Sequence, residues 1–228
     1  MNVLVVGASG LCGSFFLKYA LESTKVAKVY TLTRSPSPPA APQSEKLVAL
    51  VEPDGKLWGH AVRGIPGDLD VLLSALGTTR AAAGAEGQYA VDHDLCVAVA
   101  RAARNDKNCK SVALVSSAGA HTDSRFFYTR MKGDTERDIA ALAFPHAVFL
   151  RPGILLGQRT TKHTGFGNVL ATKVGQWLYR SKCQSLIWYP VKGSEVAQVG
   201  LQLALDTEGT KPRVDIVASN EILNLAKQ

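Results

Sequence analysis

Three glycines near the start of the chain constrain the fold more than any other feature of the sequence. The segment MNVLVVGASGLCGS places Gly7, Gly10 and Gly13 between a continuous apolar run at residues 3–6 and a stretch with helical spacing at residues 11–21. The first glycine permits a tight turn, the second lets the backbone approach a pyrophosphate, and the third lets the helix pack closely on the strand. Free N–H groups at the start of such a helix bind phosphates. The segment therefore predicts a strand, a loop and a helix that bind a dinucleotide.

Strand-length apolar runs alternate with helical segments along the rest of the chain. The runs lie at residues 29–32, 47–51, 71–76, 112–115 and 147–150, and helical spacing occupies residues 89–104 and 125–142. The runs are continuous rather than alternating, which is typical of parallel strands buried on both faces. The sequence therefore predicts an α/β fold of the Rossmann type, a doubly wound parallel sheet with helices on both faces.

The last third of the chain is less periodic. Its predicted elements are helices at 168–179 and 195–205, a strand at 214–217 and a short C-terminal helix. We expect a single domain over 1–228, in which residues 155–190 form a small C-terminal elaboration on the substrate side. Two segments predict loops: SPSPPAAP at 35–42, where proline excludes a helix or a central strand, and AAAGAEG at 81–87.

The composition predicts a soluble, intracellular protein. Apolar residues make up 46% of the chain and charged residues 20%, as in ordinary globular domains. No stretch of about 18 uncharged apolar residues occurs, so no membrane-spanning helix is expected. A first strand that begins at Val3 leaves no room for a targeting peptide. The cysteines show no C-x-x-C pair and no metal-ligand spacing with histidine, which predicts reduced thiols and no metal site. They are Cys12, Cys96, Cys109 and Cys183.

The net charge of +7 comes from one segment. Residues 139–194 contain no Asp or Glu but hold Arg151, Arg159, Lys162, Lys173, Arg180, Lys182 and Lys192. This segment is either a solvated surface or a patch that faces an anion: a cofactor phosphate, an acidic substrate or anionic lipid, which would give peripheral membrane contact. Nucleic acid is not expected as a partner, because no compact Lys/Arg run is interleaved with aromatic residues.

The end of the second predicted strand bears on the choice of dinucleotide. A site selective for NAD usually carries an acid about 20 residues after the glycine loop, which binds the ribose hydroxyls. Here Arg34 stands at that place, and no acid lies between Glu22 and Glu45. An arginine can pair with a 2′-phosphate, and the neighbouring Thr33 and Ser35 can add hydrogen bonds. The sequence therefore favours NADP(H) over NAD(H).

A serine pair, a tyrosine and a lysine supply candidate catalytic groups. In VALVSSAGA a strand ends in Ser116 and Ser117, at the carboxyl edge of the sheet where ligands bind in this fold class. Tyr128 and Lys132 are four residues apart on the next predicted helix and therefore share one face. Lys132, as a fixed cation, would favour the phenolate of Tyr128 and hold the nicotinamide ribose. Tyr128 would then donate a proton to the developing alkoxide of a carbonyl substrate while a serine hydroxyl orients that carbonyl.

These motifs resemble the short-chain dehydrogenase/reductase superfamily of the atypical or extended kind. More narrowly, LGTTRAAAGAEG, VDHDL, LVSSAGA, FFYTRMKGDTE and LRPGILLGQR are similar to the subgroup of the HIV Tat-interacting oxidoreductase and its fungal counterparts at the mitochondrial outer membrane. The resemblance covers residues 1–159. It implies a location in the cytosol or on the cytosolic face of that membrane, and an unidentified carbonyl substrate, for which the basic segment suggests an anion. The oligomeric state is not readable from the sequence.

The resemblance also implies roles for individual residues. It makes Ser117, Tyr128 and Lys132 catalytic, with the last two also in contact with the cofactor. Further cofactor contacts would come from the phosphate loop at Ser9, Gly10, Leu11 and Cys12, from the adenine side at Leu76, Gly77 and Thr78, and from the nicotinamide side at Pro152, Ile154 and Leu155. Tyr128 comes only 11 positions after Ser117, closer than in most of the superfamily, so the pocket wall has to come from the 155–190 segment.

Two other functions remain open at the level of sequence. One is a regulatory or adaptor protein whose NADP(H) occupancy controls contact with a partner or a membrane. The other is an epimerase or isomerase that retains its nicotinamide and uses the same tyrosine and lysine. Asp92, His93 and Asp94 are expected in the first turn of a helix, where acids suit the helix dipole, rather than in a metal site.

Overall fold

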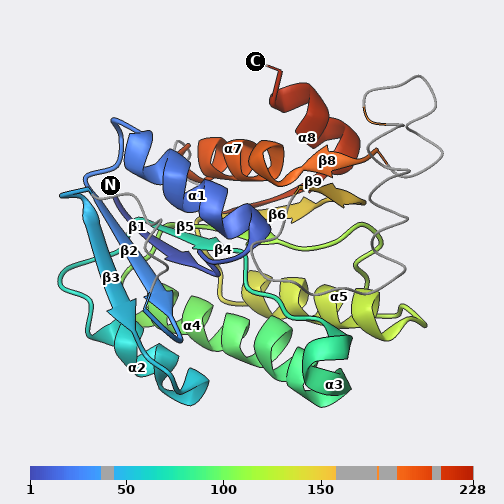
Figure 1. Ribbon diagram of the computed structural model, residues 1–228, viewed down its shortest axis with the longest axis horizontal. Coiled ribbons are helices and arrows are strands. Elements are labelled where there is room, and N and C mark those ends of the chain that lie inside the picture. Colours follow the sequence, from blue (N-terminus) through green and yellow to red (C-terminus); the bar gives the residue numbers. More distant parts are fainter. Residues whose placement is uncertain (37–43, 158–178, 180–188, 207–211, 228) are drawn as a thin grey trace.

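A computed structural model describes residues 1–36, 44–157, 179, 189–206 and 212–227 of the chain. Seven strands form one parallel sheet in the order β3-β2-β1-β4-β5-β6-β9 (Figure 1). They are β1 (Asn2–Val6), β2 (Lys28–Thr33), β3 (Leu47–Val51), β4 (Val71–Ser74), β5 (Ser111–Val115), β6 (His146–Arg151) and β9 (Arg213–Ala218). A two-stranded parallel ribbon joins β7 (Leu155–Leu156) to β8 (Val191–Lys192). The predicted Rossmann-type sheet is confirmed.

Helices cover both faces of the sheet. In Figure 1, α1, α7 and α8 lie on one side and α2, α4 and α5 on the other. The helices are α1 (Leu11–Glu22), α2 (Trp58–Arg63), α3 (Arg80–Tyr89), α4 (Cys96–Asp106), α5 (Phe127–Ala140), α7 (Gly193–Ala204) and α8 (Ser219–Leu225), with a 3-10 turn at Gly55–Leu57 and a π-helix at Ala90–Leu95. The order of the strands reverses between β1 and β4, so the carboxyl ends of these two strands open the crevice in which such folds bind ligands.

The prediction of a loop at residues 81–87 is wrong. The segment forms α3, whose first turn is capped by the Thr79 hydroxyl, which accepts a hydrogen bond from the Ala82 N–H at 3.2 Å. The alanines are strong helix formers, and the helix is interrupted at Gly84, whose non-helical φ of +70° makes a kink in α3. The short helix α2 was not predicted, because six residues are too few to show helical periodicity.

Several predicted elements fall partly or wholly outside the described residues. The loop at 35–42 is described only at its first two residues, and the helix at 168–179 only at Tyr179. Most of the substrate-side segment at 155–190 is outside as well. The described part includes its first strand, β7, which pairs with β8 directly after the segment. Among the described residues, no helix is long and apolar enough to cross a membrane.

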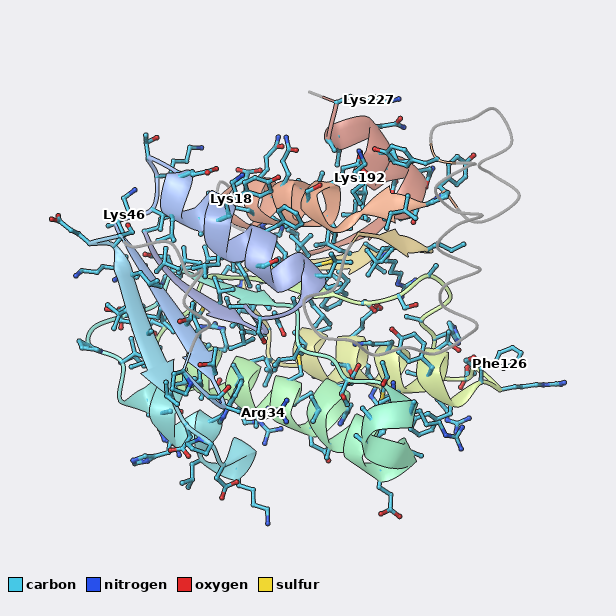
Figure 2. All side chains as sticks on the ribbon, viewed as in Figure 1. Lys18, Arg34, Lys46, Phe126, Lys192 and Lys227 are labelled. Carbon is cyan, nitrogen blue, oxygen red and sulfur yellow. The ribbon has the colours of Figure 1, made fainter. Side chains whose placement is uncertain are left out.

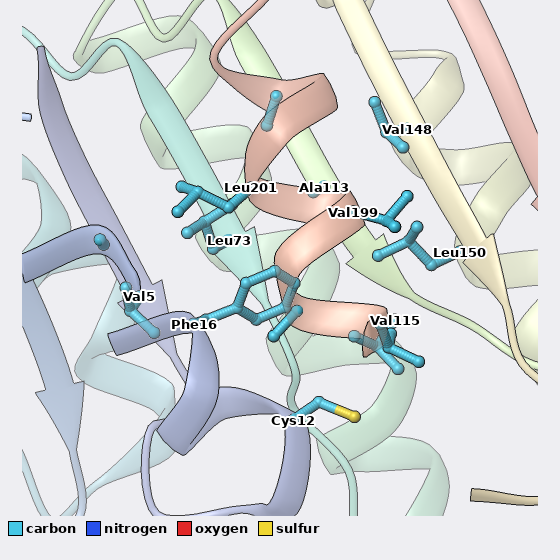
Figure 3. Packing of buried hydrophobic residues seen from close by; sticks show 14 of the residues in the cluster. Val5, Cys12, Phe16, Leu73, Ala113, Val115, Val148, Leu150, Val199 and Leu201 are labelled. Atoms are coloured by element: carbon cyan, nitrogen blue, oxygen red, sulfur yellow. The ribbon is translucent and has the colours of Figure 1, made fainter. Parts of the chain in front are cut away.

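Phe16 fills the centre of the core between the sheet and the helices α1 and α7. It is fully buried and lies among Leu73, Leu150 and other side chains of this layer (Figure 3). A Cβ atom added at Gly200 would come within 2.5 Å of Leu150 Cδ1 and 2.9 Å of the Phe16 ring, so this glycine lets α7 approach α1 and the sheet. A second apolar layer fills the other face, beneath α2 and α4. The close packing of α1 on the sheet fixes the phosphate loop, which leads directly into that helix.

We expect Phe16→Ala to lower the free energy of unfolding by about 3–5 kcal/mol, because it removes a fully buried ring from a packed layer. Phe126→Ala is the matched control. Its ring is 77% exposed at the start of α5, so its loss should change stability by less than about 0.5 kcal/mol. Urea denaturation of the two variants makes the comparison, and equal losses would contradict this account of the core.

Candidate active site

The glycine loop between β1 and α1 has the shape that a bound pyrophosphate requires. Gly7 has a φ of +79°, and a Cβ atom there would lie 2.4 Å from the Ala75 carbonyl oxygen. A Cβ atom at Gly13 would lie 1.9 Å from the Gly7 carbonyl oxygen, so this glycine lets the loop rest on the helix. Gly10 precedes the first turn of α1 and gives it no side-chain cap. The N–H groups of that turn are therefore placed to bind an anion, and the loop fits a dinucleotide.

The other loop residues expected to contact the cofactor point in different directions. Ser9 is exposed beside Gly10, as a phosphate contact requires. The Cys12 side chain is buried in the core near Phe16 (Figure 3), so only its backbone can face a phosphate. The Leu11 side chain packs against the ends of the β7–β8 ribbon, where a Cβ atom at Gly157 would lie 2.5 Å from Leu11 Cδ1. Leu11 therefore joins the phosphate loop to the base of the substrate-side segment.

Arg34 lies at the carboxyl end of β2, the strand next to β1, which leads into the glycine loop. Figure 2 labels it near the end of that strand, and its side chain is exposed. The neighbouring Thr33 hydroxyl donates to the Ser35 carbonyl oxygen at 2.7 Å. β2 pairs with β1, so the ends of the two strands are neighbours. The arginine is therefore placed at the edge where the adenosine ribose of a dinucleotide binds in this fold class.

The loop after β4, which holds Leu76, Gly77 and Thr78, is fastened by side chains from the adjoining helical run. The Thr78 N–H donates to Asp92 Oδ2 at 2.7 Å, and Gln88 Nε2 donates to the Thr78 carbonyl oxygen at 3.1 Å. A Cβ atom at Gly77 would approach Asp92 Oδ1 to 3.3 Å. This loop is thereby held at the carboxyl edge, beside the phosphate loop.

Tyr128 and Lys132 share one face of α5, as predicted, but their surroundings differ. Tyr128 is 42% exposed, whereas the side chain of Lys132 is 3% exposed, with its ammonium nitrogen 5.9 Å from the centre of the Tyr128 ring. Ser117 is the second residue after the end of β5, and its hydroxyl donates to the Ala118 carbonyl oxygen at 3.3 Å. The loop continues along α5, where the His121 N–H donates to the Thr129 carbonyl oxygen at 3.1 Å. The three predicted catalytic residues thus come from two elements joined by one short loop.

Sequence reasoning missed the partner of Lys132. Its Nζ lies 3.0 Å from Asp92 Oδ1, and both side chains are buried. The expectation that Asp92, His93 and Asp94 stand in a helix N-terminal turn is wrong, because they lie in the π-helix Ala90–Leu95 within a continuous helical run from α3 to α4. Such π turns widen a helix and often mark functional sites. No local motif links two residues 40 positions apart, so the sequence carried no signal for this pair.

The ion pair keeps Lys132 charged. Burial by itself opposes the ammonium, but the electrostatic interactions with Tyr128 and with the Asp92 carboxylate outweigh it and raise the pKa of Lys132 above its ordinary value. Burial also raises the pKa of the Cys96 thiol, which lies beside the pair and therefore stays neutral. Lys132 is thus a cation, as the sequence predicted, but one that is paired with Asp92.

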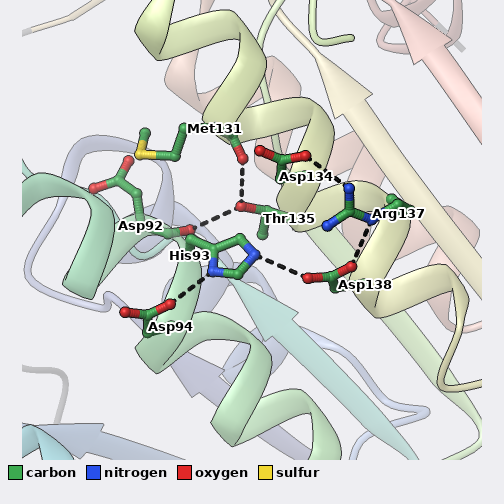
Figure 4. A network of polar contacts seen from close by, with 8 residues as sticks. All are labelled: Asp92, His93, Asp94, Met131, Asp134, Thr135, Arg137 and Asp138. Atoms are coloured by element: carbon green, nitrogen blue, oxygen red, sulfur yellow. Dashed lines mark hydrogen bonds and ion pairs between the residues drawn. The ribbon is translucent and has the colours of Figure 1, made fainter. Parts of the chain in front are cut away.

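A polar network braces the π-helix against α5 (Figure 4). The two His93 ring nitrogens lie 2.8 Å from Asp94 Oδ1 and 3.0 Å from Asp138 Oδ2. Arg137 binds Asp138 at 2.7 Å, and this hydrogen bond is the main cause that lowers the pKa of Asp138. The Thr135 hydroxyl lies 3.3 Å from the Asp92 carbonyl oxygen. No group of three or more His, Cys, Asp or Glu side chains within the described ranges is arranged to bind a metal ion.

The turn at Pro152, Ile154 and Leu155 follows β6 and lies against the serine loop. The Ala118 N–H donates to the Pro152 carbonyl oxygen at 2.8 Å, and the Val191 N–H donates to the Ile154 carbonyl oxygen at 3.0 Å. Leu155 begins β7. The turn thus connects the carboxyl edge of the sheet to the base of the substrate-side segment.

Two of the seven basic residues of the 139–194 segment are among the described residues. Arg151 is paired with Glu136, and the Lys192 ammonium lies 4.8 Å from the centre of the Tyr179 ring. The remaining five lie outside the described residues: Arg159, Lys162, Lys173, Arg180 and Lys182. An anion-facing patch therefore stays a prediction, with Arg151 already neutralised.

We expect Asp92→Asn to lower the free energy of unfolding by about 3–5 kcal/mol, because it leaves a buried ammonium without its counter-ion. The raised pKa of Lys132 means that this contribution is fully present below pH 10.5 and is lost as the pH rises through the folded-state pKa above that value. Urea denaturation at neutral and strongly alkaline pH measures the difference.

Asp94→Asn is the control for this experiment, since Asp94 is 62% exposed and bonds only to His93 in the described structure. A double variant, Asp92→Asn with Lys132→Met, removes both charges, keeps a side-chain oxygen for the Thr78 N–H and should recover most of the lost stability. Equal effects of the two single substitutions would contradict the ion-pair account.

The comparisons with known proteins agree with this geometry. No family model matches the chain. It is 49% identical to "Protein FMP52, mitochondrial" of Saccharomyces cerevisiae over 99% of this chain and 96% of that protein, and 39% identical to the protein of the same name from Candida albicans, over 99% and 98%.

Solved structures share the fold at low sequence identity. A short-chain dehydrogenase family protein from Francisella tularensis has a TM-score of 0.67 at 14% identity and covers 97% of this chain and 98% of its own. The enzyme WbmH of Bordetella bronchiseptica in complex with NAD+ has a TM-score of 0.70 at 13% identity, covering 99% of this chain and 79% of its own. The chain therefore belongs to the family of the FMP52 proteins, an atypical group with the short-chain dehydrogenase/reductase fold.

Proposed function

We propose that this protein is an oxidoreductase that uses NADPH to reduce the carbonyl group of a small molecule. The observation that carries the proposal is the half-exposed Tyr128, whose ring lies beside the buried, charged Lys132. Both residues are on α5, at the carboxyl edge of the sheet, where the glycine loop also follows β1. Structures with this fold have been solved with NAD bound, among them WbmH, which supports a nicotinamide cofactor in this crevice.

The chain's own residues supply the proton chemistry. The bound nicotinamide would supply the hydride. Tyr128 has the exposure needed to donate a hydrogen bond to the carbonyl oxygen and then its proton to the alkoxide that forms there. Lys132 stabilises the phenolate left behind, and Ser117 supplies a hydroxyl to orient the carbonyl. Because Asp92 offsets part of the charge of Lys132, the stabilisation of the phenolate is weaker than an unpaired lysine would give.

The preference for NADPH rests on Arg34. The exposed guanidinium at the end of β2 can form a charge-assisted, bidentate contact with the 2′-phosphate, and no acid stands there to bind the ribose of NAD. The substrate is not identified. An anionic one fits the basic 139–194 segment, as does peripheral contact with an anionic membrane. The name of the Saccharomyces cerevisiae relative supports a mitochondrial location.

A second candidate is an epimerase that retains its nicotinamide. The UDP-glucuronic acid 4-epimerase of Bacillus cereus in complex with NAD shares the fold, with a TM-score of 0.67 at 12% identity. This chain covers 78% of that structure. Nicotinamide that copurifies tightly and exchanges slowly would favour the epimerase, whereas rapid exchange of cofactor favours the reductase. A nucleotide-bound adaptor would bind NADPH without turnover of any carbonyl.

We expect Tyr128→Phe to lower kcat for a carbonyl substrate by about 100-fold or more, since it removes the proton donor. The dissociation constant of NADPH should change by less than about twofold, because the ring is kept. A screen of aldehydes, ketones and quinones, followed through NADPH oxidation, identifies the substrate for this measurement. Tyr19→Phe, on α1, loses a phenolic hydroxyl away from the site and is the control. Turnover by Tyr128→Phe at the wild-type rate would overturn the mechanism.

We expect Arg34→Ala to raise the dissociation constant of NADPH about tenfold or more and to leave that of NADH nearly unchanged. A charge-assisted contact is worth about 1.5–3 kcal/mol. Thermal shifts with NADPH, NADP⁺, NADH and NAD⁺ measure both, because a ligand at about 100 times its dissociation constant stabilises the fold by about 2.7 kcal/mol. Arg63→Ala, a half-exposed arginine on α2, is the control. Equal losses for both nucleotides would refute the role of Arg34, and no shift with any nucleotide in nucleotide-free protein would refute the proposed function.

A further inference from the structure

Glu136 is a buried carboxylate that the proposed chemistry does not use. It lies one helical turn after Lys132 on α5 and is 5% exposed. One of its oxygens accepts from the Ser116 hydroxyl and from Arg151 Nε at 3.0 Å, and the other accepts from Arg151 Nη2 at 2.5 Å. This single side chain therefore joins α5 to the ends of β5 and β6.

The joined strand ends lead into the two loops that face each other at the candidate site. Ser116 precedes Ser117, and Arg151 precedes Pro152. The ladder between β5 and β6 ends at the pair Val115 and Leu150, after which the Ser116 N–H donates to the Leu150 carbonyl oxygen at 2.8 Å. Beyond that point one backbone hydrogen bond, from the Ala118 N–H to the Pro152 carbonyl oxygen, spans the two loops in the described structure. Glu136 thus acts where the backbone ladder stops.

The chemistry of the contact makes it rigid. A carboxylate that binds the Nε and Nη2 donors of an arginine holds the guanidinium in one plane, and these charge-assisted hydrogen bonds are about twice as strong as neutral ones. The Arg151 side chain is 27% exposed, so part of the pair is screened by solvent, but the carboxylate is not. Glu136 therefore adds a side-chain restraint on Ser116 and Arg151 to the two backbone hydrogen bonds that already join these strand ends.

We propose that Glu136 is a positioning residue that sets the spacing between the Ser117 loop and the Pro152 turn, and thereby the fit of the nicotinamide end of the cofactor. The proposal rests on the proposed function. There, the Pro152 turn adjoins the nicotinamide, the glycine loop binds the pyrophosphate, and Arg34 binds the 2′-phosphate. It follows that Glu136 affects the nicotinamide half of NADPH but not the adenosine half.

The test compares NADPH with adenosine 2′,5′-bisphosphate, which lacks the nicotinamide. Glu136→Gln should raise the dissociation constant of NADPH about tenfold, the loss expected for one charged hydrogen bond, and should change that of the bisphosphate by less than about twofold. Asp134→Asn, a carboxylate of the same helix that pairs with Arg137, is the control and should change neither. A merely structural role would lower the unfolding temperature but leave the ratio of the two constants unchanged.

Each outcome decides the proposal. If Glu136→Gln does not fold, Ser116→Ala replaces it, since this variant keeps the pair between Glu136 and Arg151. It should raise the dissociation constant of NADPH by a smaller factor and again leave that of the bisphosphate nearly unchanged. Equal weakening of both nucleotides, or no weakening of either, overturns the positioning role while the proposed function stands. Binding of neither nucleotide by the wild-type protein overturns the proposed function and this inference with it.

Discussion

The buried ion pair between Lys132 and Asp92 holds the candidate site together. Lys132 belongs to α5, which also carries Tyr128, and the other oxygen of Asp92 accepts from the Thr78 N–H in the loop after β4. A single carboxylate thus ties the helix of the proposed acid to a loop of the proposed cofactor crevice. Replacing a buried ion pair by apolar residues is often neutral or stabilising, so stability alone does not account for this one. The pair instead holds the ammonium group of Lys132 at a fixed position beside Tyr128.

The two buried carboxylates of the site bind different partners. Asp92 comes from the π-helix and reaches the lysine from one side, whereas Glu136, on α5 itself, reaches the strand ends through Ser116 and Arg151. Both are acceptors for several donors at once, which is how a buried carboxylate meets its requirement for hydrogen bonds. Together they make α5 a rigid frame against which a cofactor and a substrate can be aligned.

The fold was readable from the sequence because its signals are local. The glycine spacing and the continuous apolar runs of the strands each lie within a few residues, and all of them predicted elements that the structure contains. The site was readable only in part. Tyr128 and Lys132 follow from helical spacing, but the partner of Lys132 depends on a π turn that changes which way Asp92 faces, and no local pattern reports such a turn. The same limit explains α3, where the Thr79 cap starts a helix that continues beyond the kink at Gly84.

The pairing of charges also bears on the substrate. The basic segment suggested an anion, yet at the described edge of the site Lys132 faces Asp92 and Arg151 faces Glu136, so these charges cancel in pairs. The exposed Arg34 lies at the far end of the crevice, where the adenosine binds in this fold class, and in the proposed function its charge pairs with a 2′-phosphate. These two pairs therefore offer no uncompensated charge to an anionic substrate. A preference for an anion would come from other basic residues, such as those between positions 159 and 182 of the sequence or the exposed Arg125 and Arg130 on either side of Tyr128.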